Sequence, residues 1–141
     1  MRVMAVDYGD AHTGVAISDP TGLLAGWTTT VHSRMEDAVV EELARLVREH
    51  QVEELVVGLP RNMDGTEGPR AQLCRAFADK LCQACGLEAV LWDERRTTVD
   101  AHRLLLQAGK NGKKRKKTVD AVAASLILEG YLTFRKTQTK D

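Results

Sequence analysis

The sequence contains few cysteines, few prolines and few aromatic residues, and it has no long apolar run. Its three cysteines include a CxxC pair, Cys82 and Cys85, but no second pair or paired histidines complete a zinc site, so we interpret the thiols as structural and reduced. No apolar run is long enough to cross a bilayer, and the first residues lack the basic, apolar and cleavage regions of a signal peptide. These absences predict a cytoplasmic protein without a membrane partner.

The net charge is +0, because 20 Lys and Arg residues balance 20 Asp and Glu residues. This balance argues against a protein that binds nucleic acid over its whole surface, and the 4% aromatic content argues against base stacking as the main binding mode. The neutral total hides one basic segment, since six of the nine residues in 109–117 are Lys or Arg. Such a segment can bind a polyanion locally.

The remaining composition is typical of one globular domain, with 141 residues, 43% of them hydrophobic and 28% charged. We expect this domain to cover residues 1–134, with a polar tail at 135–141. Turn signals and apolar periodicity predict the following elements: strands over 2–8, 14–18 and 23–31, a helix over 33–50 that Ser33 caps, a strand over 55–59, a helix over 70–85, a strand over 87–92, a helix over 97–107, a basic loop, and a helix over 119–134. This order predicts an α/β fold with a mixed five-stranded sheet, three antiparallel strands and then parallel ones, and helices on both faces.

Acidic side chains stand at the ends of predicted elements. Asp7 ends the first strand, where it can be either a common turn residue or a functional acid. Asp93 and Glu94 follow the last strand, and as neighbours they point to opposite faces, so only one of them can face the same pocket as Asp7. Asp120 stands in the first turn of the final helix, where a carboxylate can also serve the helix N-terminus alone.

A convergence of these acids would create a metal site. The small residues Ala123 and Ala124 would let the final helix lie close to the sheet. That would bring Asp120 toward Asp7 and Glu94, and three converging carboxylates repel one another unless a cation neutralises them. Hard oxygen ligands favour Mg²⁺ or Mn²⁺. Two such ions about 3.5–4 Å apart are a known arrangement for in-line attack on a phosphodiester.

Four motifs in this order carry a resemblance across nearly the whole chain. They are Asp7-x-Gly9 running to Gly14-Val15-Ala16, Gly58-Leu59-Pro60-x-Asn62-x-Asp64-Gly65 with Gly68-Pro69-Arg70-Ala71, Asp93-Glu94-Arg95 with Thr97-Thr98, and Lys117-x-x-Asp120-Ala121-x-Ala123-Ala124. Together they resemble the YqgF family of bacterial ribonuclease H-fold nucleases, and the second motif is quite specific. This family is related to the Holliday junction resolvase RuvC and is assigned to maturation of pre-16S ribosomal RNA.

The resemblance implies roles for particular residues. By position, Asp7, Glu94 and Asp120 resemble the family's catalytic metal ligands for Mg²⁺ or Mn²⁺, and Glu94 is favoured over Asp93. The resemblance implies nucleic-acid contacts from the loop of the second motif, the exit of the last strand and the basic segment: Asn62, Asp64, Arg95, Lys110, Lys113, Lys114, Arg115, Lys116 and Lys117. It implies no organic cofactor.

The sequence departs from the family pattern in two ways. Family members commonly carry a basic residue where His12 stands, and histidine is only partly protonated near neutral pH. Resolvases of the RuvC type carry a further acid one turn after the helix aspartate, where this chain has Ala123 and Ala124. The missing acid favours RNA cleavage over junction resolution.

The leading hypothesis is therefore a metal-dependent nuclease that acts on structured nucleic acid, pre-16S ribosomal RNA first, as a monomer or weak homodimer. One alternative is a DNA nuclease that resembles a Holliday junction resolvase. Another is a non-catalytic assembly factor that binds RNA or the ribosome. The Asp7-x-Gly9 hairpin also resembles the phosphate loop of actin-like ATPases, but 141 residues are too few for the second lobe of that group.

Overall fold

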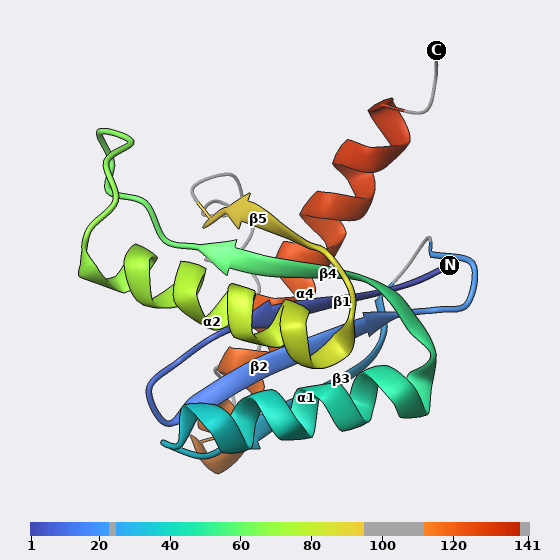
Figure 1. The fold of residues 1–141 in the computed structure, drawn as a ribbon, viewed down its shortest axis with the longest axis horizontal. Helices are drawn as coiled ribbons and strands as arrows, with labels where there is room; N and C mark the ends of the chain where they lie inside the picture. The colour runs from blue at the N-terminus through green and yellow to red at the C-terminus, as the bar shows by residue number, and fades with distance from the viewer. Residues whose placement is uncertain (23–24, 95–111, 139–141) are drawn as a thin grey trace.

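The computed structural model describes residues 1–22, 25–94 and 112–138, and within the last helix it describes the side chains of residues 121–136. The elements in chain order are β1 (Arg2–Asp7), β2 (His12–Ser18), β3 (Ala25–His32), α1 (Glu36–His50), β4 (Val52–Leu59), α2 (Pro69–Cys85), β5 (Ala89–Asp93) and α4 (Gly112–Gln138), as Figure 1 shows. The predicted helix over 97–107 lies outside the described residues. No described helix has the length and apolar character needed to cross a membrane.

The strands form one sheet in the order β3-β2-β1-β4-β5. Strand β2 is antiparallel to both β1 and β3, whereas β4 is parallel to both β1 and β5. The predicted mixed five-stranded sheet is therefore confirmed. Because β1, β4 and β5 run in the same direction, their carboxyl ends, at Asp7, Leu59 and Asp93, lie at one edge of the sheet.

Helices cover both faces of the sheet, so its central strands are buried on both sides. Figure 1 shows α1 and α2 on the near face and α4 on the far face. Alternate residues of β1 serve the two cores, with Met4 and Val6 on one side and Val3 and Ala5 on the other. The near core also contains Val39, Leu43, Phe77 and Leu81, and the far core contains Val56, Ala124, Ile127 and Leu128.

Two predicted boundaries were wrong. The final helix begins at Gly112 rather than at residue 119, so the basic residues 113–117 lie within α4 rather than in a loop. Lys and Arg are good helix formers, and no proline interrupts this run. The predicted break over 51–54 is reduced to Gln51, which ends α1 in a left-handed conformation (φ 56°) and lets β4 begin at Val52.

The predicted cap by Ser33 was also wrong, because α1 begins at Glu36 and its N-cap residue is Met35. The Ser33 hydroxyl instead accepts a hydrogen bond from the Met35 backbone N–H at 3.1 Å, one turn before the helix starts. At the other end of the chain, α4 continues to Gln138, and Arg135 donates a hydrogen bond to Glu54 Oε2 at 3.0 Å. The segment that the sequence suggests as a polar tail thus begins as helix.

Candidate active site

Two of the three predicted acids meet at the edge of the sheet where β1 and β5 end. Asp7 is the last residue of β1, Glu94 directly follows β5, and β4 lies between these strands. The two partly buried carboxyl groups are hydrogen bonded to each other, so one of them carries a proton. Burial, then the charge of Asp7 and this hydrogen bond, raise the pKa of Glu94 to about 7.

Gly58 makes room for the Glu94 carboxyl group on the intervening strand. A Cβ at position 58 would lie inside contact distance of Glu94 Oε1, 3.2 Å from Glu94 Cδ and 2.7 Å from Ile127 Cδ1. The Glu94 side chain therefore lies over the bare backbone of β4, between that strand and α4. The close approach of Glu94 to Asp7 depends on this glycine.

Arg70 brings a positive charge to the carboxyl pair. It is the second residue of α2, and its Nη2 donates a hydrogen bond to the Tyr8 carbonyl oxygen, while Nη1 pairs with Asp10 Oδ1 at 2.7 Å. Its guanidinium carbon lies 5.4 Å from the centre of the Tyr8 ring. The charge of Arg70 lowers the pKa of Glu94, against the larger effects that raise it. Sequence reasoning assigned Arg70 no role, although it belongs to the second motif.

The turn after Asp7 is held by Tyr8 and Gly9. The Tyr8 ring stacks on Phe77 of α2 with a centroid distance of 4.0 Å and an interplanar angle of 9°, and its hydroxyl donates to Glu36 Oε2 at 3.4 Å. A Cβ on Gly9 would collide with the carbonyl oxygen of His12. These contacts fix the backbone that carries Asp7. The close approach of the His12 carbonyl oxygen is also sufficient to explain why Asp7-x-Gly9 contains a glycine, and no bound ligand is needed to explain it.

Cys74 lies in the small core cluster below this edge of the sheet, with Leu59 and Ala71. Burial raises the pKa of the Cys74 thiol to about 11. A thiol with such a pKa is protonated near neutral pH and is not an activated nucleophile. This result agrees with the structural interpretation of the thiol.

Asn62 and Asp64 brace their own loop, which leaves the end of β4 and leads to α2. Asn62 Nδ2 donates to Thr66 Oγ1 at 2.9 Å, and Asp64 Oδ1 accepts from the Thr66 backbone N–H at 2.9 Å and from its hydroxyl at 2.6 Å. Gly65 has a φ of 89°, which this tight turn requires. Figure 1 shows the loop projecting beyond the sheet at the edge where β4 and β5 end.

The remaining predicted site residues cannot be compared with the structure at the level of side chains. Arg95 and Lys110 lie outside the described residues. The backbone of α4 includes the positions of Lys113, Lys114, Arg115, Lys116, Lys117 and Asp120, but their side chains lie outside the described part of the chain. His12, where the family commonly has a basic residue, instead shares a hydrogen bond with His32 between the two Nδ1 atoms at 2.8 Å.

The carboxyl pair fits a divalent cation. Its donor atoms are carboxylate oxygens, which Mg²⁺ and Mn²⁺ prefer, and the charge of Asp7 together with burial already disfavours the ionised form of Glu94 in the absence of a cation. Within the described side chains, no group of three His, Cys, Asp or Glu gathers as a metal site. Asp7 and Glu94 would supply two ligands, and the third predicted ligand, Asp120, is among the side chains outside the description.

Comparison with solved structures defines the class of the fold. RuvC of Thermus thermophilus in complex with a Holliday junction matches with a TM-score of 0.67 at 12% identity, covering 99% of this chain and 97% of that chain. The Holliday junction resolvase of fowlpox virus matches with a TM-score of 0.57 at 15% identity, covering 98% of this chain and 99% of that one. The protein is therefore an α/β domain with the ribonuclease H-like fold of RuvC.

Comparison of sequences defines the family. The family described as RuvX: Holliday junction resolvase matches residues 1–134, and the chain belongs to this family. A protein of Moorella thermoacetica is 49% identical over 132 residues, covering 94% of each chain, and one of Carboxydothermus hydrogenoformans is 44% identical over 135 residues, covering 96% of this chain and 98% of that one. Both relatives are named as candidate pre-16S rRNA nucleases. The resemblance to the YqgF family is confirmed.

Proposed function

We propose that this protein is a Mg²⁺- or Mn²⁺-dependent nuclease that hydrolyses phosphodiester bonds in structured nucleic acid, with pre-16S ribosomal RNA as its first candidate substrate. The observation that carries the proposal is the pair of hydrogen-bonded carboxyl groups, Asp7 and Glu94, at the carboxyl ends of β1 and β5. The names of full-length relatives at 44–49% identity support this reaction and this substrate.

In this proposal Asp7, Glu94 and Asp120 hold the metal. Position 120 lies about two helical turns before Ile127 in α4. The Ile127 side chain and the Glu94 carboxyl group both lie against Gly58, so α4 runs beside the carboxyl pair. A bound divalent ion neutralises the carboxylates and polarises a phosphoryl oxygen. Asp7 and Glu94 orient it from two rigid strand ends, and burial under α4 limits the access of water to Glu94.

Nucleic-acid contacts are proposed from two places. The basic residues 113–117 form the first turns of α4, which leads directly to position 120, so they would supply phosphate contacts beside the carboxyl pair. The braced loop that carries Asn62 and Asp64 would line the other side, together with Arg95. We propose that the protein acts in the cytoplasm as a monomer or weak homodimer.

A cleavage panel tests this function. Stem-containing pre-rRNA fragments and a four-way DNA junction are incubated with the wild-type protein and Mg²⁺ or Mn²⁺, and with Asp7→Asn as the control. We expect metal-dependent cleavage of RNA that Asp7→Asn lowers by about 100-fold or more, the scale on which one preorganised electrostatic contact affects turnover. Undiminished cleavage by Asp7→Asn would refute the proposal. Tight, salt-sensitive binding without any turnover would instead favour the non-catalytic assembly factor.

A Holliday junction resolvase is the second candidate, because the matching family carries that description and RuvC bound to a junction shares the fold. Symmetric cutting of a four-way junction requires two copies of the site related by a twofold axis. Paired incisions in the junction, together with a dimer in sedimentation, would therefore favour this candidate over RNA processing.

A further inference from the structure

The Arg70–Asp10 pair differs in exposure between its two partners. The Asp10 side chain, in the turn between β1 and β2, is 85% exposed, whereas the Arg70 side chain is 36% exposed. Arg70 is also anchored on its inner side, because Nη2 donates to the carbonyl oxygen of Tyr8 and the guanidinium lies over the Tyr8 ring. The arginine is thus positioned by the fold, while Asp10 contacts it from solvent.

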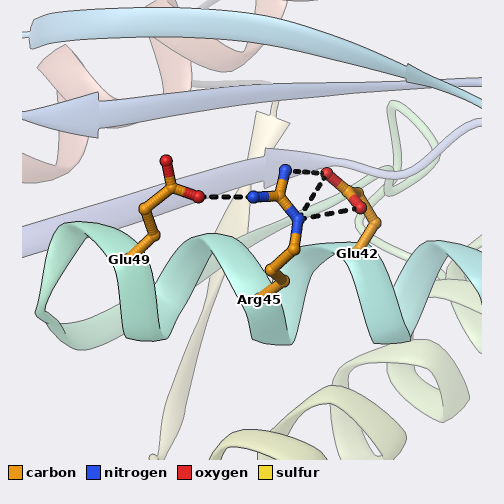
Figure 2. Close-up of polar contacts among 3 residues, drawn as sticks. All are labelled: Glu42, Arg45 and Glu49. Carbon is orange, nitrogen blue, oxygen red and sulfur yellow. Dashed lines mark hydrogen bonds and ion pairs between the residues drawn. The ribbon is translucent and has the colours of Figure 1, made fainter.

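Arg70 is directed toward the proposed reaction centre. The carbonyl oxygen that it binds belongs to the residue after Asp7, and its positive charge acts on Glu94. Other arginines of the described chain pair with other acids: Arg45 with Glu42 and Glu49 on α1, as Figure 2 shows, Arg75 with Glu67, and Arg135 with Glu54. No arginine other than Arg70 is among the described groups that shift the pKa of Glu94.

We propose that Arg70 binds a phosphate group of the substrate strand next to the carboxyl pair, and that Asp10 occupies the Nη1 donor only while no nucleic acid is bound. A guanidinium N–H donates to a carboxylate oxygen or to a phosphate oxygen alike. An ion pair with a largely exposed partner is weak, so a phosphate can displace Asp10. The contact between Nη2 and the Tyr8 carbonyl would keep the guanidinium oriented during the exchange. This inference rests on the proposed nuclease function.

The exchange predicts opposite effects for the two partners. Removing Asp10 as an internal competitor by Asp10→Asn should tighten binding of nucleic acid about two- to fivefold, the range that corresponds to the strength of a surface ion pair. Arg70→Gln should weaken binding and reduce the slope of log K against log[salt] by about 0.9 on a duplex, which corresponds to one lost phosphate contact. Arg70→Lys keeps a charge without the fork, so we expect an intermediate affinity.

The Arg45 cluster on α1 provides matched controls (Figure 2). Glu42→Gln and Arg45→Gln change the net charge by the same amounts as Asp10→Asn and Arg70→Gln. These variants should leave both the affinity and the salt slope unchanged. All five changes, Arg70→Lys included, are made in Asp7→Asn protein, and binding of a labelled RNA stem and of a four-way DNA junction is followed by fluorescence anisotropy at several salt concentrations.

The inference is overturned if Asp10→Asn weakens binding or matches Glu42→Gln, or if folded Arg70→Gln keeps the salt slope of the Asp7→Asn parent. If Arg70→Gln does not fold, the Asp10→Asn variant still tests the inference, because the Asp10 side chain lies almost entirely in solvent and its replacement should leave the fold intact. Cleavage by the otherwise wild-type chain separates the two proposals. If that chain cleaves with Mg²⁺ but Asp10→Asn does not lower KM, only the Arg70 inference fails. If the chain shows neither binding nor cleavage, both the proposed function and the Arg70 inference fail.

Discussion

Replacing Gly58 by alanine should impair the site far more than it destabilises the fold. The new Cβ would collide with Glu94 Oε1 and would stand 2.7 Å from Ile127 Cδ1. Both atoms are the far ends of flexible side chains, which can move aside. We therefore expect a free energy of unfolding lower by only about 1 kcal/mol, at the lower end of the cost of overpacking.

To make room for the new Cβ, the Glu94 carboxyl group must move away from Asp7. This movement keeps the loss of stability small, but it also disrupts the carboxyl pair. We expect Gly58→Ala to lower metal-dependent cleavage at least about tenfold, since displacement of a reacting group by about 1 Å can cost more than this. Cleavage of the RNA substrate and urea denaturation, measured on the same preparation, give the two numbers.

Gly86→Ala provides the matched control. Gly86 ends α2 with a φ of 70°, and a Cβ there would meet nothing within 4 Å, so alanine costs backbone strain without any collision. We expect a loss of stability of about 1 kcal/mol and unchanged cleavage. Equal loss of cleavage in the two variants, or wild-type cleavage by Gly58→Ala, would refute the role given to Gly58.

Two further predictions concern the groups around this site. Because the pKa of Glu94 is raised to about 7 in the folded protein, folding favours its protonated form, so the contribution of Glu94 to the stability of the metal-free protein should be greatest at low pH and should be lost as the pH rises through about 7. Glu94→Gln should remove this dependence from urea midpoints measured between pH 5 and 8, and persistence of the slope would contradict the assignment. Phe77→Ala should lower the free energy of unfolding by about 3–5 kcal/mol, because Phe77 is fully buried and supports the Tyr8 ring. A loss below about 1 kcal/mol in urea denaturation would show that the Tyr8–Phe77 stack does not hold the turn after Asp7.

The order of elements followed from short-range patterns. The apolar runs along 2–8 and 14–18, and the apolar stretch 55–59, indicated strands, and they are β1, β2 and β4 in the structure. The start of α4 was missed because Gly112 and the basic run have the composition of a loop, whereas helix propensity of Lys and Arg outweighs it. The cap of α1 was missed because Ser33 binds the Met35 N–H instead of a helical one.

Part of the site was predictable for the same reason. Parallel strands place their carboxyl ends at one edge, so Asp93 or Glu94 was expected to meet Asp7, and the family resemblance favoured Glu94. The roles of Gly58 and Arg70 were not predictable, because they depend on contacts between residues far apart in the chain. Arg70 contacts Asp10 and the Tyr8 carbonyl across 60 and 62 positions, and Gly58 matters only because Glu94 and Ile127 converge over it.

Direct binding of Mn²⁺ tests most sharply whether the carboxyl pair is a metal site. Electron paramagnetic resonance reports free Mn²⁺ during titration of the wild-type protein, Asp7→Asn and Glu94→Gln, while a weakly buffered sample at pH 6.5 reports released protons. We predict that the wild-type protein binds Mn²⁺ with release of up to about one proton per site, because the ion replaces the proton that Asp7 and Glu94 share. Both variants should lose this binding, and Mn²⁺ binding of wild-type strength in Asp7→Asn would contradict the account.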